Sequence, residues 1–380
     1  MDKSNTILET SEETKKKIEL IEKYPTIEIL TKEDLARLFE TQDHIEHYIG
    51  FEISGMVHIG IGLFCGSKIA DIQKASVDVK VFMADWHSFV NNKLGGDWEN
   101  YAIVGKLMAE CLKRCAEVFG ADRDKIKTVL GSEIYNNDYW RTVLEVSRSI
   151  TVSRIKRSTI ILGRSKEKNL SFAQLLYVPM QVADIFFMGN HIAQGGMDQR
   201  KAHVIAREVY NKVHCPIRIG NEIAKPIAIH TDILYSLAMK NIPEKTDDKE
   251  SLVEEIKMSK SKPNSAIFLD EPIEEIERKI MKGFCPQGEI EYNPVIQLAK
   301  LLFRDEKNIV LERDQKYGGD ITFDNVNELV QEYAKGTIHP LDLKRLVAER
   351  LIELVKPINK WLREGPGKEY SEIIWKNITR

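Results

Sequence analysis

Residues 48–60 read Tyr48-Ile-Gly-Phe-Glu-Ile-Ser-Gly-Met-Val-His-Ile-Gly60, a strand-like start followed by a glycine-lined turn. At such a strand-to-helix turn, backbone N–H groups can approach the phosphates of a nucleotide. Further along, residues 257–261 read Lys257-Met-Ser-Lys-Ser261, where two lysines flank a small hydroxyl residue and can surround a triphosphate. Together the two stretches suggest a site that activates an amino acid with ATP, although a lysine–serine run alone is more often a solvated loop.

Short strand-like runs alternate with longer helical patterns on both sides of this turn. The strand-like runs are His47–Phe51, Asp78–Ala84, Lys127–Gly131, Ile192–Gln194 and Pro226–His230, and the helical patterns cover 12–23, 98–119, 138–162 and 199–213. This alternation predicts an α/β fold with a Rossmann-like, mostly parallel sheet, whose ligands bind at the carboxyl ends of the strands. Near those ends the chain places Gly50, Asp85, Gly131 and Gly195.

The length of 380 residues favours two domains that share one cleft. The pattern divides the chain into a helical N-terminal extension (1–35), a Rossmann-type catalytic domain (36–235) with a helical connective insertion near 138–170, a linker with the lysine–serine loop (236–272) and an all-helical domain (273–380). The linker contains the charged run 244–250.

The composition narrows the class of protein. A formal net charge of −3 gives no overall nucleic-acid footprint, so any RNA binding must be local. The five cysteines form no close metal-type cluster and fit buried thiols in a reducing cytoplasm. No apolar stretch approaches the ~18 residues of a membrane-spanning helix. We therefore expect a cytoplasmic protein without a membrane span and without protein ligands for a metal.

A candidate ligand-binding face lies in the helical pattern around 176–186. On an α-helix, Tyr177, Gln181 and Asp184 share one face at i, i+4 and i+7, and Pro179 fits if the helix begins near it. The apolar flanks leave little solvent-exposed face for a phenol, an amide and a carboxylate. We expect these groups to face a ligand, and the alternative is a polar solvent stripe.

A second candidate follows in the stretch 194–203. Gly195 and the glycine after it permit close backbone approach to a ligand, Asp198 can cap the next helix, and Gln199 can point into the cleft. Arg200 and Lys201 can face phosphates. The alternative is a capped helix with a solvated basic first turn.

With these residues in place, the chain resembles the class I aminoacyl-tRNA synthetases, and among them the tyrosyl-tRNA synthetases of archaeal and eukaryotic type. The matching stretches are Tyr48-Ile-Gly50-Phe-Glu52-x-Ser54-Gly55, His58-Ile-Gly60, Ala84-Asp85-Trp86-His87, Tyr177-x-x-Met-Gln181-x-x-Asp184, Gly195-Gly196-Met-Asp198-Gln199-Arg200-Lys201, Lys257-Met-Ser-Lys-Ser261, Tyr317-Gly-Gly-Asp320 and His339-Pro-Leu-Asp342. They run in family order from about residue 36 to about residue 358, which makes the resemblance far more specific than any one motif.

The resemblance implies a role for each pocket residue. Tyr48 and Asp184 would hydrogen-bond the phenolic hydroxyl of substrate L-tyrosine. The α-ammonium would be held by Tyr177, Gln181 and Gln199, with Glu52 close to the reacting end. A buried donor and acceptor pair that only a hydroxyl can satisfy penalises a substrate without one, so the resemblance implies strong rejection of phenylalanine.

The resemblance also implies the ATP contacts and the reaction. The catalytic residues would be His58, Lys257 and Lys260, and the ATP-binding residues would be Gly50, His58, Gly60, Lys257, Ser259 and Lys260. The tyrosine carboxylate would attack the α-phosphorus, giving tyrosyl-adenylate and pyrophosphate, and the tyrosyl group would then pass to the 3′ end of tRNA(Tyr). Mg²⁺ would be bound mainly by phosphates and water.

The C-terminal segment resembles the anticodon-binding domain of the family. Tyr317 offers a stacking face and Asp342 a carboxylate for the first anticodon base, with His339 beside them. Their alternative is a glycine turn followed by an N-capped helix. Arg200, with the basic run 154–157, would approach the acceptor stem. The family is typically a symmetric homodimer, so we expect one here.

Two departures from the family pattern stand out. Ile61 replaces a second, phosphate-contacting histidine, and we expect Gly60 and Gly62 to let the phosphates contact N–H groups directly there. The proline lies two residues after Tyr177 instead of one. Two alternatives remain open: a tryptophanyl-tRNA synthetase, whose indole pocket needs no carboxylate paired with a tyrosine, and a non-catalytic RNA-binding paralogue, which only Ile61 supports.

Overall fold

The computed structural model describes residues 10–158, 170–243, 252, 256–259 and 265–377. The N-terminal part contains α1 (Glu12–Glu22), β1 (Thr26–Leu30), α2 (Lys32–Thr41), β2 (Glu46–Phe51), α3 (Ile59–Lys74), β3 (Asp78–Met83), α4 (Asp85–Val90), α5 (Trp98–Glu117), β4 (Lys127–Leu130), α6 (Gly131–Ile134), α7 (Asn137–Arg148), α8 (Val152–Ser158), α9 (Phe172–Phe187), β5 (Ile192–Gly196), α10 (Arg200–Val209), β6 (Arg218–Ile219), β7 (Glu222–Ile223) and β8 (Ile227–Thr231). The C-terminal part contains α12 (Ile273–Lys282), α13 (Pro294–Leu302), β9 (Ile309–Leu311), β10 (Ile321–Phe323), α14 (Val326–Ala334), α15 (Pro340–Glu364) and α16 (Lys368–Asn377). The charged run 244–250 of the linker lies outside the described residues.

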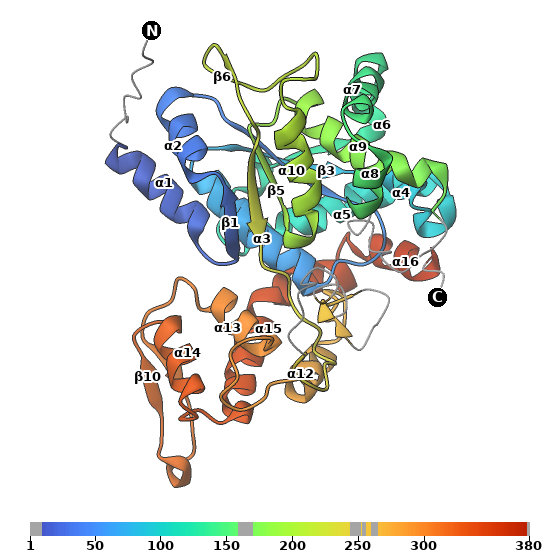
Figure 1. Ribbon diagram of the computed structural model, residues 1–380. Coiled ribbons are helices and arrows are strands. Elements are labelled where there is room, and N and C mark those ends of the chain that lie inside the picture. Colours follow the sequence, from blue (N-terminus) through green and yellow to red (C-terminus); the bar gives the residue numbers. More distant parts are fainter. Residues whose placement is uncertain (1–9, 159–169, 244–251, 253–255, 260–264, 378–380) are drawn as a thin grey trace.

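A six-stranded sheet in the order β1-β8-β5-β2-β3-β4 forms the centre of the N-terminal part (Figure 1). Strands β8, β5, β2, β3 and β4 are parallel, and β1 pairs antiparallel with β8 at the edge. This arrangement confirms the predicted α/β class with a mostly parallel sheet. The five predicted strand-like runs correspond to β2, β3, β4, β5 and β8.

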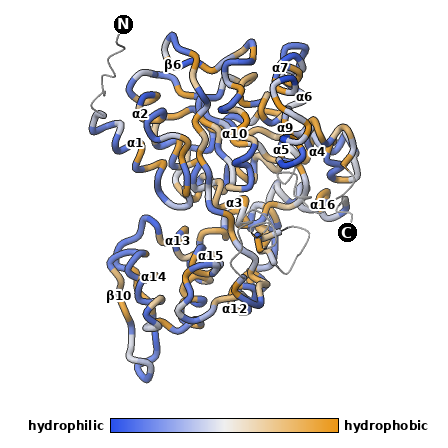
Figure 2. Tube along the Cα trace, viewed as in Figure 1, coloured by the Kyte–Doolittle hydropathy of each residue, from blue (hydrophilic) through white to orange (hydrophobic). Residues whose placement is uncertain are grey.

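Helices cover both faces of the sheet. Successive side chains of β2 point to opposite faces, so that Ile49 joins the core with α3 and α5, whereas Tyr48 joins the core with α9 and α10. Hydrophobic positions accordingly dominate the segments that cross the middle of the molecule, whereas the outer helices α1 and α2 carry mostly hydrophilic ones (Figure 2). None of the described helices is long and apolar enough to cross a membrane.

Strand β1 was not predicted from the sequence. The segment 1–35 was expected to be helical, but Thr26–Leu30 extends the sheet beyond β8. The predicted helical pattern 138–162 also divides into α7 and α8, and its last residues lie outside the described ranges. The C-terminal part is helical as expected apart from one short antiparallel pair, β9 with β10.

The C-terminal part is tied back to the sheet by α16, which packs on α5 (Figure 1). The Tyr370 hydroxyl donates to the Gly55 carbonyl at 3.0 Å, and the Trp375 indole N–H donates to Asp270 Oδ2 at 2.6 Å. The end of the chain therefore supports the turn between β2 and α3.

A buried ion cluster also joins the two parts. Asp71 of α3 accepts two hydrogen bonds from the Arg304 guanidinium, at 2.8 and 2.9 Å, and one from Lys68 Nζ at 2.8 Å. Lys68 Nζ also donates to the carbonyls of Ile21 and Lys23, at 2.9 and 2.8 Å. The end of α1, the body of α3 and the segment after α13 thus meet at one carboxylate.

Candidate active site

The predicted pocket residues of α9 lie on one face of that helix. The helix begins at Phe172 with a capping box formed by Ser171 and Gln174, so Pro179 is an interior residue and the predicted start near it is wrong. The three side chains named from the sequence still project together, because the i, i+4 and i+7 spacing is unchanged by the earlier start. Tyr177 and Asp184 are buried and Gln181 is half-buried.

The far end of this face is a buried, carboxylate-centred pocket. Asp184 is only 2% exposed, and burial raises its pKa to about 8. Tyr48 is also buried, and its pKa is raised by burial and by the negative charge of Asp184. The Tyr135 hydroxyl donates to Asp184 Oδ1 at 2.6 Å. Gly50, two residues after Tyr48, is the exposed residue of β2.

The near end of the face is formed by amides and a second carboxylate. Gln181 Nε2 donates to Gln199 Oε1 at 3.1 Å, so the structure brings these two predicted residues together. The pKa of Tyr177 is raised by burial and by the nearby carboxylate of Glu52. Glu52 in turn accepts a hydrogen bond from Asn91 Nδ2 at 2.6 Å, which holds it against the pocket.

The glycine turn after β5 lies beside these amides. A Cβ on Gly195 would lie 2.9 Å from the Gln199 Cβ, so a larger residue would push that side chain away. Asp198 does not cap α10, whose N-cap is Gln199 without a side-chain hydrogen bond. Instead, Asp198 Oδ2 lies 3.5 Å from Lys257 Nζ. The predicted cap is therefore wrong, and the carboxylate links the pocket loop to the lysine–serine stretch.

The predicted ATP turn forms the N-terminus of α3. His58 is the buried N-cap residue, and its own side chain forms no capping hydrogen bond. A Cβ on Gly60 would lie 3.1 Å from His58 Nδ1, which places the imidazole directly over this glycine. We expected phosphates to contact N–H groups directly at Gly62, and this prediction is wrong. The N–H groups of Ile61 and Gly62 both donate to the His58 carbonyl. A Cβ on Gly62 would also lie 2.9 Å from Cys115 Sγ, so this glycine serves the packing of α3 on α5.

Backbone contacts with the segment after β8 hold the start of the lysine–serine stretch. The Met258 N–H donates to the Leu234 carbonyl at 2.8 Å, and Lys257 pairs with Tyr235 in a short bridge. The backbone N–H of Ser259 donates to Ser265 Oγ at 3.3 Å. Lys260, which was predicted to contact the triphosphate, lies outside the described residues.

The predicted RNA-contacting residues lie in separate regions. Arg200 forms a bidentate ion pair with Glu28 of β1, at 2.8 to 3.1 Å. Tyr317 is 66% exposed on the loop between β9 and β10. His339 is the N-cap of α15 and accepts from the Leu341 N–H, and Asp342 lies in the first turn. Among the described contacts, none joins Tyr317 to the start of α15.

Two pocket residues were missing from the predicted site. One is Tyr135, which comes directly after α6, and the other is His87 of α4, whose Nε2 lies 3.5 Å from Asp184 Oδ2. His87 stands in the quoted stretch Ala84–His87 after β3, so its place at a strand end was the signal for it. For Tyr135 the short strand β4 was the only comparable signal.

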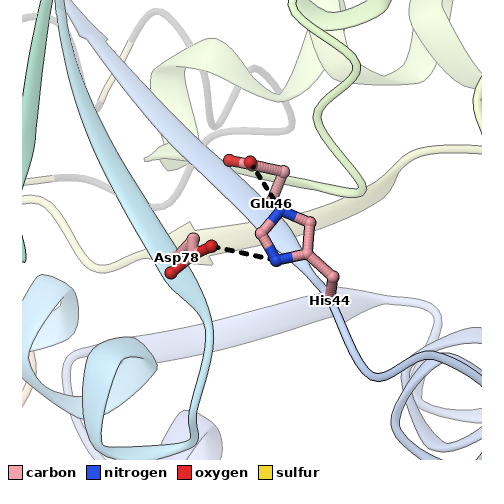
Figure 3. A group of neighbouring side chains, drawn as sticks. All are labelled: His44, Glu46 and Asp78. Carbon is pink, nitrogen blue, oxygen red and sulfur yellow. Dashed lines mark hydrogen bonds and ion pairs between the residues drawn. The ribbon is translucent and has the colours of Figure 1, made fainter.

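A separate group of metal-ligand type lies at the other ends of β2 and β3 (Figure 3). His44 contacts Glu46 Oε1 through Nε2 at 3.0 Å and Asp78 Oδ2 through Nδ1 at 3.1 Å. Lys80 Nζ lies 2.8 Å from the second oxygen of Glu46. The carboxylates already have cationic or N–H partners, so the group is explained as an exposed ion-pair cluster.

Three features together define a class I synthetase: the N-terminus of α3 after β2, the polar pocket at the strand ends and the lysine–serine stretch. The sequence pattern described as "tRNA synthetases class I (W and Y)" matches residues 40–356, and the chain belongs to this family. Within it, a tyrosine–tRNA ligase from Thermococcus gammatolerans is 46% identical over 361 residues, covering 93% of this chain and 96% of the relative.

Solved structures give the same result. The crystal structure of a tyrosyl-tRNA synthetase from Pyrococcus horikoshii, complexed with L-tyrosine, matches with a TM-score of 0.89 and 44% identity, covering 96% of this chain and 99% of that one. A tryptophanyl-tRNA synthetase from Aeropyrum pernix matches with a TM-score of 0.61 at 17% identity, covering 91% and 83%, and so shares the fold. These similarities confirm the resemblance to the tyrosyl branch of the family.

Proposed function

We propose that the protein is a tyrosine–tRNA ligase that activates L-tyrosine with ATP and transfers it to tRNA(Tyr). The observation that carries this proposal is the buried carboxylate of Asp184, which lies with Tyr48 at the closed end of the pocket. A phenolic hydroxyl can donate to that carboxylate, whereas phenylalanine or an indole ring would leave it without this partner. The 46% identity to a tyrosine–tRNA ligase supports the same substrate.

The other end of the pocket suits the amino-acid head group. The α-ammonium of tyrosine would be held by Tyr177, Gln181 and Gln199. The two glutamines are hydrogen-bonded to each other, and Tyr177 lies near Glu52. A single tyrosine side chain would therefore span from Asp184 to the glutamine pair, with its carboxylate directed toward the N-terminus of α3. This orientation converts adenylate formation into a reaction between two held groups.

The N-terminus of α3 and the lysine–serine stretch would bind ATP. The tyrosine carboxylate oxygen attacks the α-phosphorus, the bond to the pyrophosphate oxygen breaks, and pyrophosphate leaves with its charge neutralised. His58, Lys257 and Lys260 would stabilise that charge, and Gly50, Gly60 and Ser259 would lie along the nucleotide. In the second step the 3′-terminal ribose hydroxyl attacks the carbonyl carbon of the adenylate, and AMP leaves.

Mg²⁺ would arrive with the nucleotide. The one described group of metal-ligand type, His44 with Glu46 and Asp78, lies at the opposite ends of the strands. The carboxylate that is described beside the lysine–serine stretch, Asp198, is already paired with Lys257. We therefore propose that phosphate and water oxygens hold the ion.

Recognition of tRNA(Tyr) is assigned to both parts of the chain. Tyr317, His339 and Asp342 would contact the anticodon, because an exposed phenol and a carboxylate at a helix start can stack on and pair with a base. Arg200 would approach the acceptor stem, in exchange for part of its pairing with Glu28.

We also propose a homodimer in the cytoplasm. Three large apolar side chains in the connective region are exposed: Leu144, Val152 and Phe172. Helices α7 and α8, which carry the first two, both pack on α9, and exposed apolar side chains in one region of the surface favour a protein interface. The five cysteines are all free, as expected in a reducing compartment.

Transfer of the amino acid to tRNA tests the proposed function against the two alternatives, a tryptophanyl-tRNA synthetase and a non-catalytic paralogue. Purified protein is incubated with ATP, unfractionated archaeal tRNA and labelled tyrosine or tryptophan, and acid-precipitable label is measured. We expect tyrosine to be incorporated and tryptophan to be rejected. Incorporation of tryptophan would favour the tryptophanyl enzyme, and binding of tRNA without incorporation of either would favour a non-catalytic paralogue.

A further inference from the structure

Tyr135 occupies a position at the closed end of the pocket that the proposed mechanism does not use. It follows α6 and precedes α7, and its hydroxyl donates to Asp184 Oδ1 at 2.6 Å. No hydrogen bond between Tyr48 and Asp184 is seen among the described contacts. One carboxylate oxygen of Asp184 is therefore already engaged by a phenol of the protein itself.

The ring of Tyr135 is held by other aromatic rings. It stacks on Tyr139 with ring centroids 3.4 Å apart, and it lies 6.2 Å from the Phe82 ring and 6.5 Å from the Trp86 ring. Such packing restricts the phenol to one orientation. We conclude that Tyr135 is a fixed donor and not a group that swings away when a ligand enters.

The second oxygen of Asp184 faces a different environment. His87 Nε2 lies 3.5 Å from Asp184 Oδ2, beyond a good hydrogen bond. His87 is 2% exposed, its ring packs edge-on against Tyr177, and neither ring nitrogen has a hydrogen-bond partner. An unpaired buried imidazole beside a half-engaged carboxylate indicates that a polar group of a ligand belongs between them.

We propose that Tyr135 is a positioning and specificity-determining residue, which favours the ionised form of Asp184 through Oδ1 and so presents Oδ2 and His87 to the hydroxyl of the amino-acid substrate. This inference rests on the proposed function, because it assigns that hydroxyl to tyrosine. It adds a donor inside the protein to the predicted Tyr48 and Asp184 pair. In this arrangement Oδ2 accepts the substrate O–H while His87 can donate to the substrate oxygen.

The charge balance around Asp184 explains why such a donor matters. Burial raises the pKa of Asp184 to about 8, whereas the hydroxyls of Tyr135 and Tyr139 lower it. The titratable groups that face Asp184 are Tyr135 and Tyr139 from the α6–α7 segment, His87 and Asp85 from α4, Tyr48 from β2 and Tyr177 from its own helix. Burial keeps the tyrosines and His87 neutral, because it raises the pKa of the phenols and lowers that of His87 to about 3. Asp85 accepts the N–H groups of Trp86 and Ser132.

The sign of the expected pH effect follows from this balance. Below its pKa, Asp184 is protonated and accepts the substrate hydroxyl only through a neutral hydrogen bond, which is weaker than a charge-assisted one. The preference for tyrosine over phenylalanine should therefore rise with pH through about 8 in the wild-type protein. Loss of the Tyr135 hydroxyl removes a group that favours the ionised form, so the rise should move to higher pH.

The test is the kcat/KM of ATP–pyrophosphate exchange for tyrosine and for phenylalanine, measured between about pH 6.5 and 9.5, because kcat/KM reports the pKa values of the free enzyme. The ratio of the two substrates cancels their shared amino and carboxyl groups. We expect Tyr135→Phe to reduce the ratio about tenfold at pH 7, in keeping with a lost hydrogen bond to a charged group, and to recover toward the wild-type ratio at high pH.

A matched control is Tyr333→Phe, which removes another buried phenolic hydroxyl, one that donates to the Pro286 carbonyl in the C-terminal part. We expect it to leave the ratio and its pH profile unchanged. Equal losses for tyrosine and phenylalanine in Tyr135→Phe, or an unshifted profile, would overturn the inference. Because Tyr135→Phe keeps the ring in its stack, we expect the variant to fold, and thermal unfolding checks this. If wild-type protein gives no tyrosine-dependent exchange, the proposed function itself is wrong, which is a distinguishable result.

Discussion

Replacing Asp71 by asparagine should destabilise the protein more than the loss of any exposed ion pair would. Asp71 is the buried carboxylate between Lys68, which is fully buried, and Arg304, which is 5% exposed and whose other carboxylate partner, Asp305, is 49% exposed. Although burial lowers the pKa of Lys68 to about 8, the group keeps its proton at pH 7. The Asp71→Asn variant would leave two buried cations facing each other, with an amide N–H₂ directed at their donors.

The expected cost follows from this geometry. Removing one partner of a buried pair costs about 3–5 kcal/mol, because an uncompensated charge remains. With an unfolding entropy of about 2.1 cal/mol/K per residue, a loss of about 4 kcal/mol lowers the Tm of a chain of 380 residues by about 5 °C. The matched control is Lys23→Ala, which breaks a pair with Asp305 at the same junction. Its partners are 39% and 49% exposed, so we expect a loss of at most about 1 kcal/mol.

Thermal unfolding of both variants, followed by circular dichroism, measures the difference. Tyrosine-dependent exchange should survive in Asp71→Asn well below its Tm, because the substituted residue lies three turns from the N-terminus of α3. A Tm change in Asp71→Asn no larger than that of Lys23→Ala would refute the view that this cluster joins the two parts of the chain.

Three further changes test other parts of the account. Asp342→Ala should weaken charging of tRNA while leaving ATP–pyrophosphate exchange intact, and a folded variant that loses exchange would show that the anticodon assignment is wrong. His58→Ala should lose most of its exchange activity, whereas Ile61→His should change the rate by no more than about tenfold, or about 1.4 kcal/mol of barrier; a gain of several orders of magnitude would instead mark the wild type as degenerate. Glu28→Gln should tighten tRNA binding and steepen its salt dependence, because the negative charge of Glu28 no longer offsets that of Arg200; weaker binding in a filter assay would argue against an RNA contact there.

The sequence predicted the parts of the site that depend on local spacing. The face of α9 that carries Tyr177 and Asp184 follows from the helical period, and it persists although the helix begins earlier than expected. The strand ends that carry Gly50 and Gly195 follow from the alternation of strands and helices. These features need no knowledge of distant contacts.

The features that sequence patterns did not predict depend on distant contacts. Strand β1 is five residues long and is stabilised by antiparallel pairing with β8, about two hundred positions away, so its own pattern was too weak to identify it. Asp198 has a good N-capping spacing, but Lys257 offers it an ion pair instead. Tyr135 reaches Asp184 across a separation of 49 positions, which no local period encodes.

The central claim is that this pocket selects tyrosine, and the most direct measurement is ATP–pyrophosphate exchange by the wild-type protein with each of the twenty amino acids. We predict efficient exchange with tyrosine, because its hydroxyl satisfies the buried carboxylate of Asp184, far weaker exchange with phenylalanine and none above background with tryptophan. Exchange that depends on tryptophan, or a complete absence of exchange in a folded protein that binds tRNA, would contradict the account.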